Sequence, residues 1–397
     1  MNTNKKVRLS SHGSALPLAL VAILILLTVG ASVLSLGLNS RIFSIRNASN
    51  ISARCAADAG LTKALYEMNQ KLQDTPWLGY ELPCETNTYL PNCNAYYTYT
   101  VTGNPISGYR IESTGTSGQN TKKVSCALKL QGPFEAAIFT KNGLTLYNSA
   151  EVNGYNYGED KKNLKIGTNS TESGSISLKS YAIVDGDVVV GTGADPNDVI
   201  DNNGTITGHT GTLSQEYDMP PITVPNWLSS FPSSGTIKND TTLYSSAKYD
   251  SIDLNSGKTI TIEKDVIIYV TGEMILKNDA ELLIGEDASL TIYLGGNFEG
   301  KNSSNINNGT KIPKNLKIYG LDGCESMTFH NSSDLYGTIY APNANIEMDN
   351  SADVYGSVIS KSFDQKNSAD FFYDASLRDV SIHDEAVYFV VTEWNEE

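Results

Sequence analysis

Acidic side chains are densest in the segment GADPNDVIDNNG at 193–204, where Asp195, Asp198 and Asp201 recur at intervals of three residues. Carboxylates at such short spacing can bind calcium. The segment lacks the residue order of an EF-hand loop, so we favour a solvated loop with Asx turns over a calcium site. We therefore predict no metal site and keep the three aspartates as part of a candidate ligand surface.

Two tyrosines, Tyr155 and Tyr157, stand in the motif NGYNYG at 153–158. A tyrosine ring has an apolar face and a polar tip, so this pair could stack on the sugar rings of a surface polysaccharide. Packing of the rings against a neighbouring turn of the chain explains them equally well. Both tyrosines belong to the candidate ligand surface, and both interpretations stay open at this point.

No set of residues for catalysis or cofactor binding can be assembled from the sequence. The four histidines are not accompanied by a nucleophile motif such as G-x-S-x-G. The glycine-rich segments at 191–196 and 294–300 lack the Lys-Ser/Thr pair and the strand-turn-helix context of a phosphate loop. We therefore expect no catalytic residue and no cofactor.

Five cysteines occur, and their spacing does not fit a zinc site. Cys84 and Cys93 bound the ten-residue stretch CETNTYLPNC, and a disulfide closing this loop would contribute roughly 2–3 kcal/mol in an exported protein. Cys55 and Cys126 form a second candidate pair. Cys324 is then the free cysteine, acting as a small core filler.

The charge is unevenly distributed along the chain. Residues 1–46 carry five basic groups and no acid, whereas the remaining 351 residues carry 24 basic and 44 acidic groups, a net charge of −20. A body this acidic repels nucleic acid. Nucleic acid is therefore excluded as a partner.

An uncharged stretch of 27 residues, from Ser14 to Ser40, follows the basic segment. As a helix it is roughly 40 Å long, more than the ~30 Å hydrocarbon core of a bilayer needs. The lysines and the arginine before it predict, by the positive-inside rule, a cytoplasmic N-terminus and an exported body. The sequence thus predicts one span of the cytoplasmic membrane; a signal peptide is the alternative, although its apolar region would be shorter.

Helical character continues beyond the span. Small and apolar residues recur at helical spacing through RNASNISARCAADAGLTKALYEMNQKL at 46–72, which predicts that one helix runs over 14–73. The basic leader ending in Gly13, the apolar helix and AADAGLTKAL at 56–65 together resemble type IV pilin-like proteins, in particular pilus assembly proteins with a PilX-like N-terminus.

The resemblance implies that a prepilin peptidase cuts the Gly13–Ser14 bond and that the exposed helix packs with other pilins or the pilus assembly machinery. Pilins commonly carry Glu at the fifth mature position, where this chain has Leu18. That departure favours a minor pilin, or a pilin-like anchor that does not polymerise, over a major subunit.

Residues 94–131 alternate β-branched and aromatic residues with polar ones, which predicts antiparallel strands packed on the helix. From 134 onward, short strand-like runs are separated by Asn, Asp and Gly, and the phrase NSSDLYG at 331–337 returns as NSADVYG at 350–356. This spacing of 19 residues fits one coil of a β-solenoid. We expect Asn350 and Gly356 at corners, Val354 inward and Asp353 outward.

The fold class predicted is mainly β with a long N-terminal α-helix, and the chain divides into five parts. They are a leader (1–13), a transmembrane and pilin-like helix (14–73), a small β region with a candidate disulfide (74–131), a β-solenoid (132–378), and a C-terminal strand with an acidic tail (379–397). The segments AAIFTKNGLTLYN at 136–148 and LYGTIYAPNANIEM at 335–348 resemble a functionally uncharacterised domain that accompanies the PilX-like N-terminus in bacterial envelope proteins.

The function predicted is that of a minor pilin or pilus-assembly-type envelope protein with a structural or interaction role and no catalysis. The alternative is an extracellular carbohydrate-binding or carbohydrate-active β-helix protein on a pilin-like anchor. A surface-exposed cluster of at least two carboxylates with a Lys or Arg in a groove would favour that alternative, and an even, shallow face would exclude it. A third hypothesis, edge-to-edge polymerisation as in bactofilin scaffolds, is opposed by the C-terminal segment, which could cover the last coil.

Overall fold

A computed structural model describes residues 15–72, 81–105, 107–155, 164–330, 334–349, 353–366 and 369–396. The chain divides into two compact units. Unit 1 comprises residues 1–71, 79–129 and 391–397, and unit 2 comprises residues 72–78 and 130–390. The last strand of the chain therefore belongs to the unit that the N-terminal helix begins.

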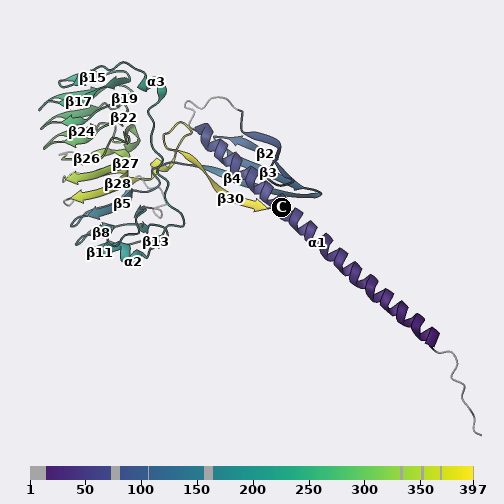
Figure 1. Cartoon of the computed structure of the whole chain (residues 1–397). Coiled ribbons are helices and arrows are strands. Elements are labelled where there is room, and N and C mark those ends of the chain that lie inside the picture. The colour runs from purple at the N-terminus through teal and green to yellow at the C-terminus, as the bar shows by residue number, and fades with distance from the viewer. Residues whose placement is uncertain are drawn as a thin grey trace, which may run out of the picture. The chain divides into compact units, whose positions relative to one another are not determined.

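Unit 1 is built on the helix α1 (Ala15–Leu72), whose two halves have different surroundings. The apolar N-terminal half is exposed, and α1 is the one helix among the described residues that is long and apolar enough to cross a membrane. The predicted stripe in the second half is buried: Ala53, Ala57, Leu61 and Met68 have almost no exposed surface. Figure 1 shows the first half of α1 extending clear of the sheet against which the second half packs.

The sheet of unit 1 has the strand order β1-β2-β3-β4-β30, with antiparallel pairing along the hairpins. The strands are β1 (Cys84–Tyr89), β2 (Ala95–Asn104), β3 (Gly108–Ser117), β4 (Asn120–Gln131) and β30 (Tyr388–Glu396). Gly115 on β3 lets the sheet approach α1 closely, because a Cβ there would overlap backbone atoms of Ala53 and Ala57. Gly60 on the helix allows the same close approach from the other side, since a Cβ added there would lie 2.8 Å from the Tyr97 ring.

Neither candidate disulfide is formed in the structure, in which all five cysteines are free. The segment after Cys84 is not a compact loop: it extends as β1, and Cys84 pairs with Thr100 while Cys93 lies in the turn at the other end of the hairpin. Cys55 is exposed on α1, whereas Cys126 is buried on β4. Cys324 is free and buried, as predicted, and burial raises the pKa of its thiol to about 12.

Unit 2 is made of short strands that pair mostly in parallel, in a 21-stranded and a 4-stranded sheet. Its strands in chain order are β5 (Ile138–Leu146), β6 (Glu151–Tyr155), β7 (Lys165–Thr168), β8 (Ile176–Leu178), β9 (Ile183–Val184), β10 (Asp187–Val190), β11 (Ile200–Asn202), β12 (Thr205–Ile206), β13 (Thr210–Thr212), β14 (Thr236–Ile237), β15 (Thr241–Leu243), β16 (Ala247–Tyr249), β17 (Ser251–Leu254), β18 (Thr259–Ile262), β19 (Val266–Val270), β20 (Met274–Leu276), β21 (Glu281–Ile284), β22 (Leu290–Leu294), β23 (Phe298–Gly300), β24 (Asn305–Asn308), β25 (Leu316–Gly320), β26 (Ser326–Phe329), β27 (Leu335–Asp349), β28 (Val354–Lys366) and β29 (Phe371–Asp374). Short helical turns α2 (Pro196–Val199), α3 (Asn226–Ser229), η2 (Pro313–Asn315) and η3 (Ala375–Arg378) lie between them.

The order of stacking in unit 2 differs from the order of the chain. The first strand, β5, pairs with β28 on one side and with β7 and β8 on the other. Strands β7 to β13 continue away from β5 in one direction, and β27 back to β14 continue away from β28 in the other. Figure 1 shows the resulting layers, from β15 and β17 at one end, through β28 and β5, to β11 at the other.

A connecting segment, residues 213–235, joins the two ends of this stack between β13 and β14. Asn169 binds both backbone groups of Tyr217 through its side chain, and the Tyr217 ring stacks on Phe139 of β5 with centroids 4.3 Å apart. Further along, the Tyr340 hydroxyl of β27 donates to the Pro220 carbonyl (2.7 Å). The segment thus covers the outward row of aromatic side chains on these strands.

The repeated phrase lies in β27 and β28, which pair in register with Leu335 opposite Val354. Both apolar residues are buried, as predicted. The aspartates do more than face water: the Asp334 carboxylate accepts a hydrogen bond from the Asp353 N–H (3.1 Å), and the Asp353 carboxylate accepts one from the Asp370 N–H (3.0 Å). Each aspartate therefore binds the backbone that leads into the next paired strand.

The sequence predicted Gly356 at a corner, and this prediction is wrong. Gly356 lies within β28, opposite Gly337 of β27. Its φ is +148°, and a Cβ there would overlap the carbonyl oxygen of Gly337. The glycine is therefore needed because two backbones approach closely. Asn350 lies outside the described residues.

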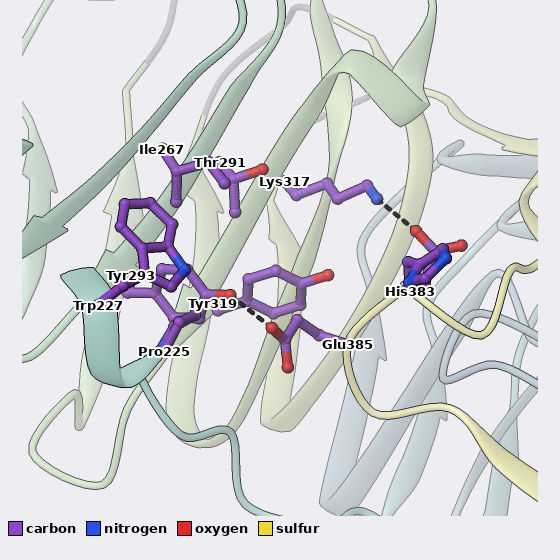
Figure 2. Close-up of a pocket in the computed structure, with 10 residues that line it drawn as sticks. Pro225, Trp227, Ile267, Thr291, Tyr293, Lys317, Tyr319, His383 and Glu385 are labelled. Atoms are coloured by element: carbon purple, nitrogen blue, oxygen red, sulfur yellow. Dashed lines mark hydrogen bonds and ion pairs between the residues drawn. The ribbon is translucent and has the colours of Figure 1, made fainter. Parts of the chain in front are cut away.

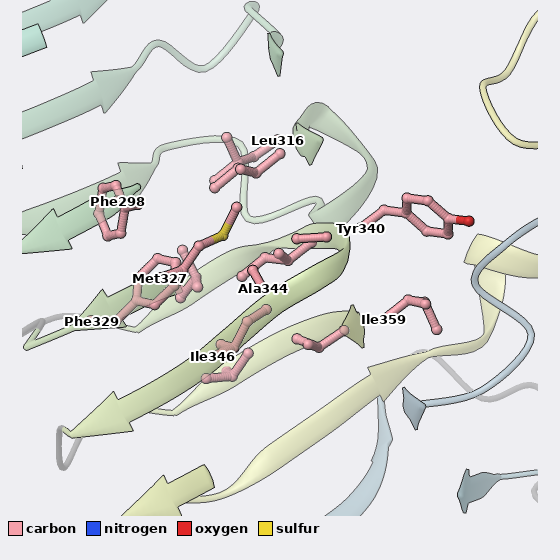
Figure 3. Packing of buried hydrophobic residues seen from close by; sticks show 14 of the residues in the cluster. Phe298, Leu316, Met327, Phe329, Tyr340, Ala344, Ile346 and Ile359 are labelled. Carbon is pink, nitrogen blue, oxygen red and sulfur yellow. The ribbon is translucent and has the colours of Figure 1, made fainter. Parts of the chain in front are cut away.

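The core of unit 2 consists of alternate side chains that point between the sheets. Phe298 and Phe329 contact each other with ring centroids 4.5 Å apart, and Met327, Ile346 and Leu316 pack nearby (Figure 3). The prediction of a mainly β chain with a long N-terminal helix is confirmed. Parallel pairing at coil-length spacing is what a solenoid requires, but closure of the coils stays a prediction.

Candidate functional site

Two of the three aspartates that the sequence had suggested for a ligand surface bind groups of their own segment. Asp195 caps α2 by accepting a hydrogen bond from the Asn197 N–H (2.9 Å), and Asp201 accepts one from the Asn203 side chain (3.1 Å). Asp198 is exposed in the first turn of α2. In the described part of the chain, no group of three or more His, Cys, Asp or Glu side chains could hold a metal ion.

Tyr155 packs against other rings. Its ring meets Tyr355 edge to face at 5.0 Å, and Tyr355 in turn stacks between Tyr336 (4.3 Å) and Phe372 (4.8 Å). The faces of these rings are turned toward one another along the stacked strands. This arrangement matches the packing interpretation of Tyr155; Tyr157, Gly13 and Ser14 lie outside the described residues.

A cavity of about 340 Å³ lies on the outward face of β19, β22 and β25, within unit 2. Ile267, Thr291 and Lys317 form one row of its floor, because they occupy matching positions in the three paired strands. Tyr293 and Tyr319 form the next row. Figure 2 shows these residues with Trp227 of α3 on one side and the C-terminal segment 383–385 on the other.

An ion pair closes one side of the cavity. The Lys317 ammonium lies 2.8 Å from Oδ1 of Asp384, while Oδ2 of Asp384 accepts a hydrogen bond from the Ser381 N–H (2.8 Å). Burial alone would raise the pKa of Asp384, but the attraction and hydrogen bond of Lys317 outweigh it and leave that pKa below its usual value. Both carboxylate oxygens of Asp384 are therefore engaged.

Glu385 is the second carboxylate of the cavity. Its Oε1 accepts a hydrogen bond from the Tyr293 hydroxyl (2.7 Å), as Figure 2 shows. Burial raises the pKa of Glu385, although Tyr293 and Lys317 act in the opposite direction. Burial also raises the pKa of Tyr293, and the neighbouring Glu385 adds to that effect. The tyrosine therefore stays a neutral donor that holds the carboxyl group in place.

The cavity combines hydrogen-bond donors and acceptors with an exposed aromatic ring. Lys317 can donate more than the one bond it gives to Asp384, and Glu385 can accept more than the one it takes from Tyr293. The Trp227 indole is 44% exposed, and Phe231 meets it edge to face at 5.6 Å. Such a set suits binding and orientation of a small polar molecule.

This cavity has no continuous signature in the sequence, because its residues come from segments between 225 and 385. Only the register of the strands and the path of the connecting segment bring them together. The run His383-Asp384-Glu385 was the one local signal. This cavity holds two carboxylates and a lysine, but the surface exposure that the carbohydrate alternative also required is not met, because the side chains of Lys317 and Asp384 are only 22% and 18% exposed.

Comparison with known proteins assigns no activity to the chain. Residues 223–380, less than half of the chain, match the family model described as "Domain of unknown function (DUF7305)". No curated protein matches the chain. A solved structure, the competence-associated pilin ComZ from Thermus thermophilus, is similar with 12% identity over 88% of this chain and 98% of that chain. Its TM-score of 0.23 is too low to carry an argument about the fold.

Proposed function

We propose that this chain is a pilin-like envelope protein, anchored by α1 in the cytoplasmic membrane, with its N-terminus in the cytoplasm and its two β-containing units exported. Its role would be structural or interactive, as a minor pilin or pilus assembly component, without catalysis. Its direct partners would be other pilins or the pilus assembly machinery, and unit 2 would be a β-solenoid that presents a rigid acidic surface.

The observation that carries this proposal is the division of α1 into two halves. An apolar stretch longer than a bilayer is thick stays exposed, while the same helix continues without a break into a stripe buried by the sheet of unit 1. A helix of this kind can pass from lipid into a folded head as one rigid element. The small residues Gly60 and Gly115 make the contact between helix and sheet close.

Mass spectrometry of the mature N-terminus tests the proposal, in cells with and without the prepilin peptidase. We expect a chain that begins at Ser14 only where the peptidase is present. A chain that begins before Ser14 in both strains would reduce α1 to a plain signal anchor, and a cut well inside residues 15–40 would make it a cleaved signal.

The alternative function is that of an extracellular carbohydrate-binding or carbohydrate-active protein on the same anchor. The cavity beside Lys317 is the observation that favours it, since Asp384 and Glu385 lie there with the lysine. The engaged state of both Asp384 oxygens favours binding over acid-base chemistry at this carboxylate.

A further inference from the structure

The cavity beside Lys317 presents both hydrogen-bond donors and hydrogen-bond acceptors in a small space. Lys317 donates, Glu385 accepts, and the Thr291 hydroxyl can do either. An anionic ligand would meet the Glu385 carboxylate, and a cationic ligand would meet the Lys317 ammonium. A neutral ligand whose own groups both donate and accept satisfies all of them, and hydroxyl groups have this property.

The opposite wall of the cavity is aromatic. Trp227 is 44% exposed, and Phe231 packs edge to face against its ring. A restrained aromatic side chain binds with little loss of conformational entropy. Its flat face suits a ligand that carries C–H groups on one side and polar groups on its rim.

The charges of the cavity are already balanced in part by protein groups. Lys317 is paired with Asp384, and the side chains of both are largely covered, at 22% and 18% exposure. Glu385 accepts a hydrogen bond from the Tyr293 hydroxyl. The polar wall is therefore fixed before a ligand arrives, which lowers the entropy lost on binding.

We propose that this cavity binds a neutral hexopyranose, with the sugar's C–H face on Trp227 and its hydroxyl groups on Lys317, Glu385 and Thr291. The volume of about 340 Å³ lies at the low end of the range for small-molecule sites, which suits one or two rings. The site differs from the aromatic stack at Tyr355, whose ring faces are occupied by one another. This inference does not rest on the proposed anchoring.

Saturation-transfer difference NMR on the full chain in detergent tests the site. The probes are methyl β-D-glucopyranoside, methyl β-D-galactopyranoside and N-acetyl-D-glucosamine, with D-glucuronate and D-glucosamine as charged analogues. We expect at least one neutral probe to bind with a dissociation constant on the order of 1 mM, with its strongest signals on one C–H face.

Two matched variants locate the binding. Trp227→Ala removes the aromatic wall and should weaken binding at least tenfold, whereas Trp394→Ala changes a tryptophan of similar exposure (50%) in unit 1 and should leave binding unchanged. The circular dichroism spectrum of each variant shows whether it folds. Glu385→Ala removes a hydrogen-bond acceptor on the side of the cavity opposite Trp227, and it should also weaken sugar binding.

Three results would overturn the inference. These are the absence of a signal from every neutral probe, tighter binding of either charged analogue, and equal loss of binding in the Trp227 and Trp394 variants. None of them bears on whether the leader is cut at Gly13, so failure of the sugar site and failure of the pilin-like proposal are distinguishable.

Discussion

Gly356 gives the sharpest test of how the strands of unit 2 stack. Its φ of +148° is one that residues with a side chain rarely adopt, and a Cβ added there would lie 2.9 Å from the Gly337 carbonyl carbon and overlap its oxygen. The substitution Gly356→Ala therefore forces β28 away from β27 or forces its backbone to change. Either response disturbs the paired, buried Leu335 and Val354.

The magnitude follows from two costs. An unfavourable backbone conformation costs about 1–3 kcal/mol, and a poorly accommodated extra group in a packed region costs about 1–3 kcal/mol more. We expect a loss of about 3 kcal/mol in the free energy of unfolding of unit 2. For a domain of this size class each kcal/mol lowers the melting temperature by roughly 2–4 °C, so the expected shift is about 6–12 °C.

Differential scanning calorimetry of the full chain in detergent measures the shift. Gly211→Ala is the matched control, because a Cβ at Gly211 meets nothing within 4 Å; it should change the transition by no more than about 2 °C. A Gly356→Ala protein that melts within about 1 °C of the wild type would refute the close approach of β27 and β28.

Three other substitutions test separate parts of the structure. Asp353→Ala removes the acceptor for the Asp370 N–H and should destabilise unit 2 by about 1–2 kcal/mol in urea unfolding, whereas loss of the exposed Asp287 should have no comparable effect. Gly115→Ala places a Cβ against the backbone of α1 and should make residues 46–72 measurably more sensitive to trypsin; unchanged cleavage rates would contradict the close contact. Burial raises the pKa of Glu385, so its contribution to the free energy of unfolding falls as pH rises above the ordinary glutamate pKa of ~4.3. Glu385→Gln should therefore gain melting temperature relative to the wild type between pH 4 and pH 7, and a constant difference would refute that shift.

The sequence predicted the features of the fold that depend on local pattern. The small and apolar stripe at helical spacing placed the buried face of α1 correctly, since Ala53, Ala57 and Met68 are all buried. The 19-residue return of the repeated phrase matched the register of β27 and β28. Both depend on periodicity along one segment, which a sequence displays directly.

The features that were missed depend on contacts between distant segments. The pairing of β5 with β28, and hence the position of the first strand in the middle of the stack, has no local signature. The same is true of the cavity, which needs the path of the connecting segment as well as the register of β19, β22 and β25. The segment after Cys84 extends as a strand where the sequence had suggested a closed loop, so the Cys84–Cys93 pair stays a prediction. The role of Gly356 was missed because a repeated glycine indicates a turn as readily as a close approach of two strands.

Thiol labelling in spheroplasts tests the central claim most directly, because the chain has its own cysteine reporters in the body that we propose is exported. Cys55, Cys84 and Cys93 are exposed in unit 1, whereas Cys126 and Cys324 are buried. After brief reduction, a membrane-impermeant maleimide should label the three exposed thiols in intact spheroplasts and the two buried ones only after unfolding. Labelling of the exposed thiols that requires lysis of the cytoplasmic membrane would contradict the export of the body and with it the proposed function.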